Sequence, residues 1–202
     1  MNLNLERILR ELKPYRERKA MVDRKHAALL VIDMQSFFVR IVRPILKNVL
    51  TVIETCREKE VPVVFTQHGH TDPRSDGGVL AQWWGEVILH GATDWKFLPE
   101  IEIESRDKIL PKKRYSAFYE TDLESFLRSK GIRDLVISGV MTNLCCETTA
   151  RDAFMRDYRV FFLIDGTATS KGEHHLATLK NLGFGFAYLM TCDELIKNLK
   201  FG

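Results

Sequence analysis

Short apolar runs alternate with amphipathic stretches along this chain, and that alternation most constrains its fold. Each run is too short for a typical helix, and its apolar residues are continuous rather than alternating with polar ones. Strands have this pattern when both of their faces are buried, as in a parallel sheet. The predicted strands are at residues 27–33, 61–67, 107–111, 132–140, 159–165 and 185–190.

Segments with a helical spacing of apolar residues separate most of these strands. Thr121 and Glu124 have the spacing of a capping box at the start of one such segment. Alternating strands and helices favour a parallel sheet with helices on both faces, a three-layer α/β/α arrangement. We predict a single α/β domain over residues 1–202. The predicted helices are at 45–57, 121–129, 145–157, 173–182 and 193–199, with an extra N-terminal helix at about 2–19.

Composition narrows the classes of function. The 30 Lys and Arg against 27 Asp and Glu give a net charge of +3, too balanced to favour nucleic acid. No apolar run approaches the ~20 residues that span a bilayer, and the N-terminus lacks the apolar core of a secretion signal. The four cysteines form no C-x-x-C pair. We therefore expect a reduced, cytoplasmic protein that acts on a small molecule, without nucleic-acid or membrane partners.

Two familiar motif classes are missing. The chain has neither G-x-G-x-x-G after a strand nor G-x-x-x-x-G-K-[ST], which disfavours a nucleotide enzyme of the usual pattern. It also lacks the G-x-S-x-G elbow of ordinary serine hydrolases. We expect no cofactor.

Polar residues follow the strands where a parallel sheet binds its ligands, beyond the carboxyl ends. Cys145 begins a helix after a strand, a position that lowers a thiol pKa and favours a nucleophile. The alternative is a buried structural cysteine. Cys146 would point about 100° further round the helix, so it is assigned to core packing or to a redox neighbour.

An ionised Asp33 at the end of a buried strand needs a partner. It is either an ion-paired structural residue or the base that takes the thiol proton. Lysine is the natural partner, and both Lys112 and Lys113 follow a strand. The alternative for these two lysines is a solvated basic turn.

Histidines and tryptophans leave further alternatives open. His68 and His70 have a spacing found in metal sites, but no third ligand is obvious, so no metal is expected. His174 and His175 are predicted as surface residues. Trp83 and Trp84 are either core residues or a wall of the substrate site. They belong to the irregular stretch 68–106, which is long enough to form lids or binding loops.

Three segments together resemble a known family. They read LLVIDMQSFF (29–38), PKKRYSAF (111–118) and GVMTNLCCETTARDA (139–153), and they are similar to the three signatures of the isochorismatase-like cysteine hydrolases. Their order and spacing agree from about residue 26 to 195. The resemblance implies a six-stranded parallel sheet flanked by helices.

The resemblance also implies roles for individual residues. Asp33 matches the acid/base aspartate, Lys112 rather than Lys113 the catalytic lysine, and Cys145 the nucleophile. A non-proline cis peptide would fall at Val140–Met141, and the oxyanion hole would use the backbone N–H groups of Met141 and Cys145. The family is usually oligomeric, so we expect a homodimer or homotetramer. The candidate substrate contacts are Gln35, Phe37, His68, Trp84 and Tyr115.

The family divides by chemistry at the cysteine. Nicotinamidases, carbamoylsarcosine amidohydrolases and ureidoacrylate-type hydrolases keep it, whereas true isochorismatases cleave a vinyl ether and typically have glycine there. Cys145 thus predicts cleavage of a C–N bond in a small amide, carbamoyl or ureido substrate through a thioester. The alternatives are a vinyl-ether hydrolase with Asp33 as the acid, and a catalytically silent binding domain. The metal motif of nicotinamidases, D-x-H and a further His, is incomplete at His68-Gly69-His70, which disfavours nicotinamide as the substrate.

Overall fold

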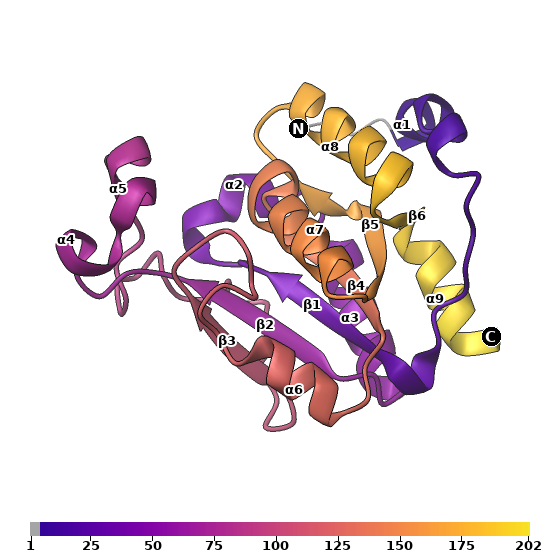
Figure 1. Ribbon diagram of the computed structural model, residues 1–202, viewed down its shortest axis with the longest axis horizontal. Coiled ribbons are helices and arrows are strands. Elements are labelled where there is room, and N and C mark those ends of the chain that lie inside the picture. Colours follow the sequence, from indigo (N-terminus) through magenta and orange to yellow (C-terminus); the bar gives the residue numbers. More distant parts are fainter. Residues whose placement is uncertain (1–4) are drawn as a thin grey trace.

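A six-stranded parallel sheet forms the centre of the computed structural model, which describes residues 5–202 (Figure 1). The strand order is β3-β2-β1-β4-β5-β6, and each neighbouring pair is parallel. The predicted fold class is confirmed. The strands are β1 (Ala27–Ile32), β2 (Val63–His68), β3 (Lys108–Lys112), β4 (Asp134–Val140), β5 (Arg159–Ala168) and β6 (Tyr188–Met190).

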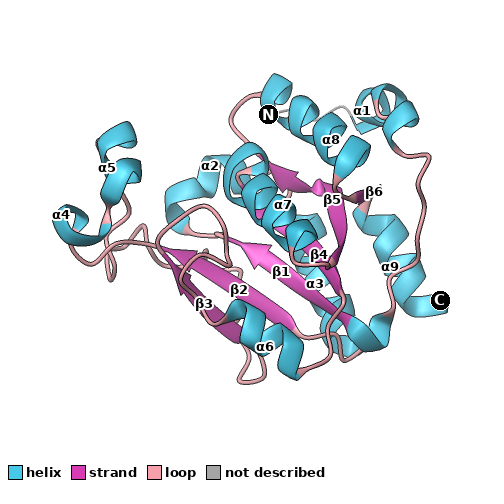
Figure 2. Ribbon diagram, viewed as in Figure 1, coloured by secondary structure: helices cyan, strands magenta, loops and turns pink. Residues whose placement is uncertain are grey.

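Helices cover both faces of the sheet, as Figure 2 shows. Alternate residues of β1 enter two separate cores: Leu29 and Val31 pack with α3 and α9, while Leu30 and Ile32 pack with α6, α7 and α8. The continuous apolar run of β1 is thus explained by burial on both sides. The helices are α1 (Leu5–Glu11), α2 (Val39–Val42), α3 (Leu46–Glu58), α4 (Pro73–Asp76), α5 (Gly78–Trp84), α6 (Leu123–Ser129), α7 (Glu147–Met155), α8 (Gly172–Gly185) and α9 (Cys192–Phe201).

The strand order reverses between β1 and β4, although all strands remain parallel. The chain moves outward from β1 through β2 to β3, then returns to the other side of β1 and continues from β4 to β6. A reversal of this kind opens a crevice beyond the carboxyl ends of the two central strands, where α/β proteins bind their ligands. Asp33 follows β1 and Met141 follows β4 at this place.

The N-terminal helix is shorter than predicted. Helix α1 ends at Glu11 and a 3₁₀ turn occupies Lys13–Tyr15, whereas the predicted helix continued to about residue 19. Pro14 removes a backbone donor and so prevents the α-helix from continuing. The start of the prediction, residues 2–4, lies outside the described residues.

Two short helices, α4 and α5, occur in the stretch predicted as irregular, and they project from the body of the molecule (Figure 1). We call residues 73–84 the arm. Neither helix contains a buried residue. Asp76 attaches the arm to the body: its carboxylate accepts a hydrogen bond from Thr71 N at 2.9 Å and contacts Lys113 Nζ at 3.1 Å. Among residues 5–202, no helix combines the length and the apolar character needed to cross a bilayer.

Candidate active site

Asp33, Lys112 and Cys145 lie in contact with one another in the crevice. Lys112 Nζ is 2.8 Å from Asp33 Oδ2 and 3.3 Å from Cys145 Sγ. The side chains of Asp33 and Lys112 are fully buried, and Cys145 is almost so. Separate strands that end at one sheet edge therefore bring together a carboxylate, an ammonium and a thiol.

Asp33 is held in an unusual conformation directly after β1. Its φ of +47° is in the left-handed region, which is costly for a residue with a side chain and is common at functional sites. Thr66 in β2 fixes the carboxylate by donating a hydrogen bond to Oδ1 at 2.5 Å and accepting one from Asp33 N at 3.0 Å. Asp33 Oδ2 is paired with the Lys112 ammonium at 2.8 Å, so both carboxylate oxygens have a partner. The carboxylate also lies beside the Cys145 thiol, close enough to accept its proton.

The charges of the ion pair stabilise each other against burial. Burial alone would raise the pKa of Asp33, but the Lys112 ammonium together with His68 and the Thr66 hydrogen bond outweighs it and holds that pKa below its usual value. Burial would likewise lower the pKa of Lys112, and the neighbouring Asp33 and Cys145 raise it instead. Both groups are therefore charged at neutral pH.

Cys145 lies in a π-helical turn, Thr142–Cys146, that leads into α7. Burial raises the pKa of the Cys145 thiol to about 12, with Lys112 lowering it and Asp33 raising it further. The expectation of a lowered pKa at a helix start is wrong, because burial and the carboxylate outweigh the lysine. The resting cluster therefore contains a thiol beside an ionised Asp33. Cys146 is fully buried among apolar residues, which supports its assignment to the core.

Gly139 allows β4 to approach β1 closely just before this turn. Its φ is +109°, and a Cβ atom there would lie 2.1 Å from the carbonyl oxygen of Ile32. Only glycine fits such a position. The peptide between Val140 and Met141 is cis, as the family resemblance implied.

A cavity of about 300 Å³ lies against Cys145. Cys145 lines it, whereas Asp33 and Lys112 are not among its lining residues. Trp84 of the arm donates a hydrogen bond from Nε1 to the Tyr115 hydroxyl at 2.7 Å, which links two walls of the cavity. The walls are mainly apolar and aromatic. They consist of Phe37, Phe38, His68, Leu80, Trp84, Glu86, Val87, Ile88, Tyr115, Met141, Leu144, Cys145 and Ser170.

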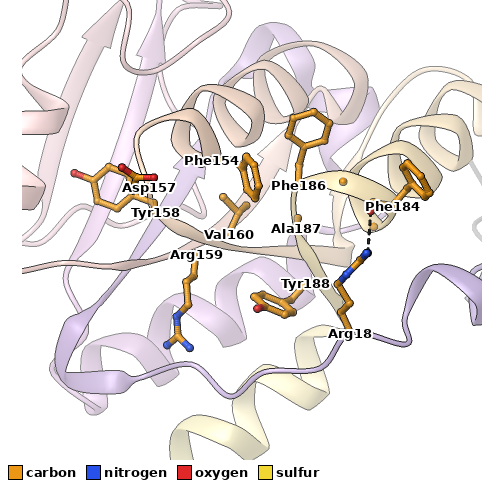
Figure 3. Close-up of a pocket in the computed structure, with 12 residues that line it drawn as sticks. Arg18, Phe154, Asp157, Tyr158, Arg159, Val160, Phe184, Phe186, Ala187 and Tyr188 are labelled. Carbon is orange, nitrogen blue, oxygen red and sulfur yellow. Dashed lines mark hydrogen bonds between the residues drawn. The ribbon is translucent and has the colours of Figure 1, made fainter.

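A larger hollow of about 530 Å³ lies elsewhere, beside β5, β6 and the ends of α7 and α8 (Figure 3). Aromatic residues such as Phe154, Phe184 and Tyr188 line it together with Arg18, whose guanidinium donates to the carbonyl oxygen of Phe184 at 2.8 Å. It includes no member of the Asp33–Lys112–Cys145 cluster. The smaller cavity is therefore the candidate active site.

Four of the five candidate substrate contacts line this cavity, and Gln35 does not. The Gln35 amide is buried and fully engaged by backbone groups: Nε2 donates to the carbonyls of His68 and Trp95, and Oε1 accepts from His68 N. A buried amide must satisfy its hydrogen bonds, and Gln35 does so by holding His68 in place. The prediction of Gln35 as a substrate contact is wrong in this respect.

His68 lines the cavity as a neutral side chain. Burial, aided by the Lys112 charge, lowers its pKa to about 3. The His68 and His70 rings are nearly perpendicular, with centroids 5.2 Å apart, and His70 Nδ1 is 3.2 Å from Asp76 Oδ1. Within residues 5–202, no group of three or more His, Cys, Asp or Glu side chains could hold a metal ion. The donor set therefore does not fit a metal site.

Several residues of the site were missed or misplaced in the sequence analysis. Thr66, which holds Asp33, was not singled out, although a hydroxyl late in a buried strand is a signal for such a role. Leu80, Val87 and Ile88 line the cavity from a stretch that has no periodic pattern. His175 is fully buried instead of lying on the surface as predicted, since it contacts Thr142. His174 is about half exposed, in line with the prediction.

The chain belongs to the isochorismatase family of hydrolases: the model of the isochorismatase domain matches residues 27–194. It is 50% identical over 190 residues to Nicotinamidase 3 of Arabidopsis thaliana, covering 93% of this chain and 96% of that protein. It is also 30% identical over 179 residues to enterobactin synthase component B of Escherichia coli (strain K12). That alignment covers 85% of this chain and 63% of the relative.

Solved structures agree with the fold. A cysteine hydrolase from Pseudomonas syringae pv. phaseolicola 1448A superposes with a TM-score of 0.86 at 24% identity, covering 90% of this chain and 96% of that one. At that identity the similarity shows the fold alone. The three-layer arrangement of Figure 1 is thus the fold of that cysteine hydrolase as well.

Proposed function

We propose that this protein is a cysteine amidohydrolase that cleaves the C–N bond of a small, uncharged amide through a thioester. One observation carries the proposal: Cys145 lines an apolar cavity, whereas Asp33 and Lys112 do not. Lys112 contacts both Asp33 and the Cys145 sulfur from behind the cavity wall. The nucleophile is thus accessible to a substrate, and its proton acceptor is shielded from water.

The acylation step uses each member of the cluster. The Asp33 carboxylate takes the Cys145 proton as Sγ attacks the amide carbonyl carbon. The Lys112 ammonium stabilises the negative charge that passes from the carboxylate to the sulfur. The backbone N–H groups of Met141 and Cys145 are the proposed donors to the oxyanion. The C–N bond then breaks, and protonated Asp33 gives its proton to the leaving amine.

Hydrolysis of the thioester completes the cycle. Asp33, ionised again, takes a proton from a water molecule that attacks the acyl carbon. The acid product leaves, and the Cys145 thiol recovers its proton from Asp33. The net reaction is amide plus water to acid plus amine, so no redox partner is needed.

The walls of the cavity define the substrate class. A flat apolar or aromatic group fits against Phe37, Trp84 and Tyr115, and neutral His68 can hydrogen bond to a polar group on it. Glu86 is the one charged residue among the described residues that line the cavity. A small neutral amide is therefore favoured over an anionic acid, which would need an unpaired Lys or Arg there.

Nicotinamide is the first compound to test, since the relative at 50% identity is named a nicotinamidase. The sequence argument against it rested only on an incomplete metal motif. Neutral His68 offers a hydrogen-bonding group in the cavity without a metal ion. No step proposed above requires a metal.

The test is a screen of nicotinamide and other small amides, ureas and carbamates for release of ammonia or amine. Cys145→Ala should abolish turnover, and intact-protein mass spectrometry of the wild type should detect the acyl group on Cys145. Turnover of an isochorismate-like acid that survives Cys145→Ala would instead support the vinyl-ether alternative, which the similarity to enterobactin synthase component B keeps in view. Absence of any turnover would favour the binding-domain alternative.

We also propose that the protein works in the cytoplasm. All four cysteines are free and buried, and Cys145 must stay reduced to act as a nucleophile. Fractionation of cells that express the natural protein would test this, and recovery from an oxidising compartment would contradict it.

A further inference from the structure

Helix α8 contacts the turn that contains Cys145 through a buried histidine that the mechanism does not use. His175 Nδ1 is 2.9 Å from the hydroxyl of Thr142, the first residue of the π-helical turn. Both side chains are fully buried. The hydrogen bond thus joins α8 to the turn three residues before the nucleophile.

Two more hydrogen bonds connect the same parts of the chain. Thr169 Oγ1 donates to Asn143 Oδ1, and Thr178 Oγ1 donates to Glu147 Oε2, each at 2.6 Å. Residues 169–178, which we call the tether segment, therefore bond to the turn and to the first residue of α7. This segment lies outside the three motifs that carry the family resemblance.

Proton transfer does not explain the histidine. Burial lowers the pKa of His175 to about 4, so its imidazole is neutral at neutral pH. It is not among the residues that line the cavity. What it can do is hold Thr142 in one orientation, since a buried hydrogen bond between two fixed elements restricts both.

We propose that His175, acting through Thr142, is a positioning residue that fixes Cys145 Sγ against Lys112 Nζ. The inference rests on the proposed nucleophilic role of Cys145. Besides burial, the groups that set the charge state of the thiol are Lys112 from β3 and Asp33 after β1. A shift of the turn changes the 3.3 Å contact with Lys112, and a misplacement of about 1 Å can cost about 10²-fold in rate.

Paired variants separate the hydrogen bond from the volume of the side chain. Thr142→Val removes the hydroxyl at nearly constant volume, and Thr142→Ser keeps it. His175→Leu removes the ring nitrogen, and His175→Asn retains a polar atom near the position of Nδ1. The control is Thr55→Val: Thr55 is a buried threonine of α3, on the other face of the sheet, whose hydroxyl donates to Thr51 O in its own helix.

Three measurements are made on each variant: the thermal midpoint of unfolding, kcat and KM, and the pH dependence of Cys145 alkylation by iodoacetamide, located by tandem mass spectrometry. Thr142→Val and His175→Leu should lower kcat about 10-fold to 100-fold with KM within about threefold, and should shift the pH dependence of alkylation. Thr142→Ser, which keeps the hydroxyl, should retain the wild-type kcat and the wild-type pH dependence of alkylation. The double variant Thr142→Val/His175→Leu should be no worse than the more affected single variant.

A purely structural role gives a different result. Thr142→Val would then lose thermal stability as Thr55→Val does, with kcat and the alkylation profile of the wild type, and the proposal would be overturned. Additive losses in the double variant would overturn it as well. The alkylation measurement needs no substrate, so it tests the role of His175 even if the protein has no amidase activity. Failure of the positioning proposal is therefore distinguishable from failure of the proposed amidohydrolase function. If His175→Leu does not fold, Thr142→Val and Thr142→Ser decide.

Discussion

The ion pair between Asp33 and Lys112 is the residue-scale feature with the largest energetic consequence. Both side chains are fully buried, so neither charge is solvated by bulk water. Such a pair adds little net stability compared with an apolar pair, but removal of one partner costs about 3–5 kcal/mol because the other is left as an unpaired buried charge. The pair is better explained by the chemistry of the thiol beside it than by stability.

Lys112→Ala should lower kcat by about 10²-fold or more, the scale of a lost electrostatic group, and should also destabilise the fold. Lys113→Ala is the matched control: the Lys113 side chain is 51% exposed, and its ion pair with Asp76 is worth at most about 1 kcal/mol. Steady-state kinetics and thermal unfolding check both variants. An inactive Lys113→Ala beside an active Lys112→Ala would show that the lysine motif is aligned one residue out of place.

The stability cost of Lys112→Ala should depend on pH. In the wild type the pKa of Asp33 is lowered, so its favourable contribution is present above the unfolded pKa of about 3.9 and is lost as the pH falls through the folded pKa. Without Lys112, burial raises that pKa and the carboxyl group takes up a proton. The difference in unfolding free energy between wild type and variant should therefore narrow below about pH 4. A difference that is constant from pH 7 to pH 3 would contradict this assignment.

Alkylation of Cys145 should be slow at neutral pH and should keep increasing beyond pH 9. The reason is the burial that raises its pKa to about 12, above the value near 8.5 of an exposed thiol. Lys112→Ala should slow alkylation further, because the lysine lowers the thiol pKa. Iodoacetamide rates at a series of pH values provide the measurement, and a plateau below pH 8 would show that the resting cluster contains a thiolate.

Secondary-structure elements were predicted well where a long apolar run defines them. Helix caps, which depend on individual side-chain hydrogen bonds, were predicted less well. The central strands β1 and β4 were predicted within two residues because continuous apolar runs have few alternatives. The capping box at Thr121 and Glu124 is absent: the Glu124 carboxylate is paired with Arg128 and Arg156 instead. A true capping box is formed by Thr191 and Glu194 at the start of α9.

The candidate site was predictable to the extent that it depends on topology. Residues that follow parallel strands must meet at one edge, and Asp33, Lys112 and Cys145 do. His175 is buried because the turn that contains Thr142 covers its side of α8. The sequence of α8 alone does not show which side of the helix that turn covers. Gln35 shows the same limit, since its partners come from segments far away in the chain.

Gly139→Ala should disrupt the junction of β4 with the Cys145 turn. The added Cβ would lie 2.1 Å from the carbonyl oxygen of Ile32, at a φ that L-residues rarely adopt, so a loss of about 3 kcal/mol or more is expected. Gly185→Ala is the control, because no atom lies within 4 Å of the added Cβ, and it should leave stability nearly unchanged. Thermal unfolding compares them, and equal midpoints would contradict the close approach of the two strands.

At the scale of the whole molecule, the arm is the part that projects from the body (Figure 1). Its Val79 and Trp83 are 73% and 75% exposed, and exposed apolar groups gathered on one projection indicate an interaction surface. We infer a homo-oligomer in which the arm is part of the contact.

Sedimentation should accordingly show a species larger than 23.4 kDa at micromolar concentration. Trp83→Ser should weaken the assembly. Phe184→Ser is the matched control, with a 74% exposed aromatic residue in a different part of the molecule, beside the hollow of Figure 3. Dissociation by Phe184→Ser but not by Trp83→Ser would move the interface away from the arm, and a monomer of about 23 kDa in the wild type would exclude the assembly.

The linkage between Trp84 and Tyr115 has a consequence for observing the molecule at work. All three tryptophans, Trp83, Trp84 and Trp95, fall within the 68–106 stretch, and Trp84 forms part of the cavity wall. The intrinsic tryptophan fluorescence of the protein therefore originates from this stretch, and one of its three sources, Trp84, lines the candidate active site. A ligand that displaces water from the Trp84 indole should change the emission without an attached dye, which makes the enzyme its own optical sensor of occupancy.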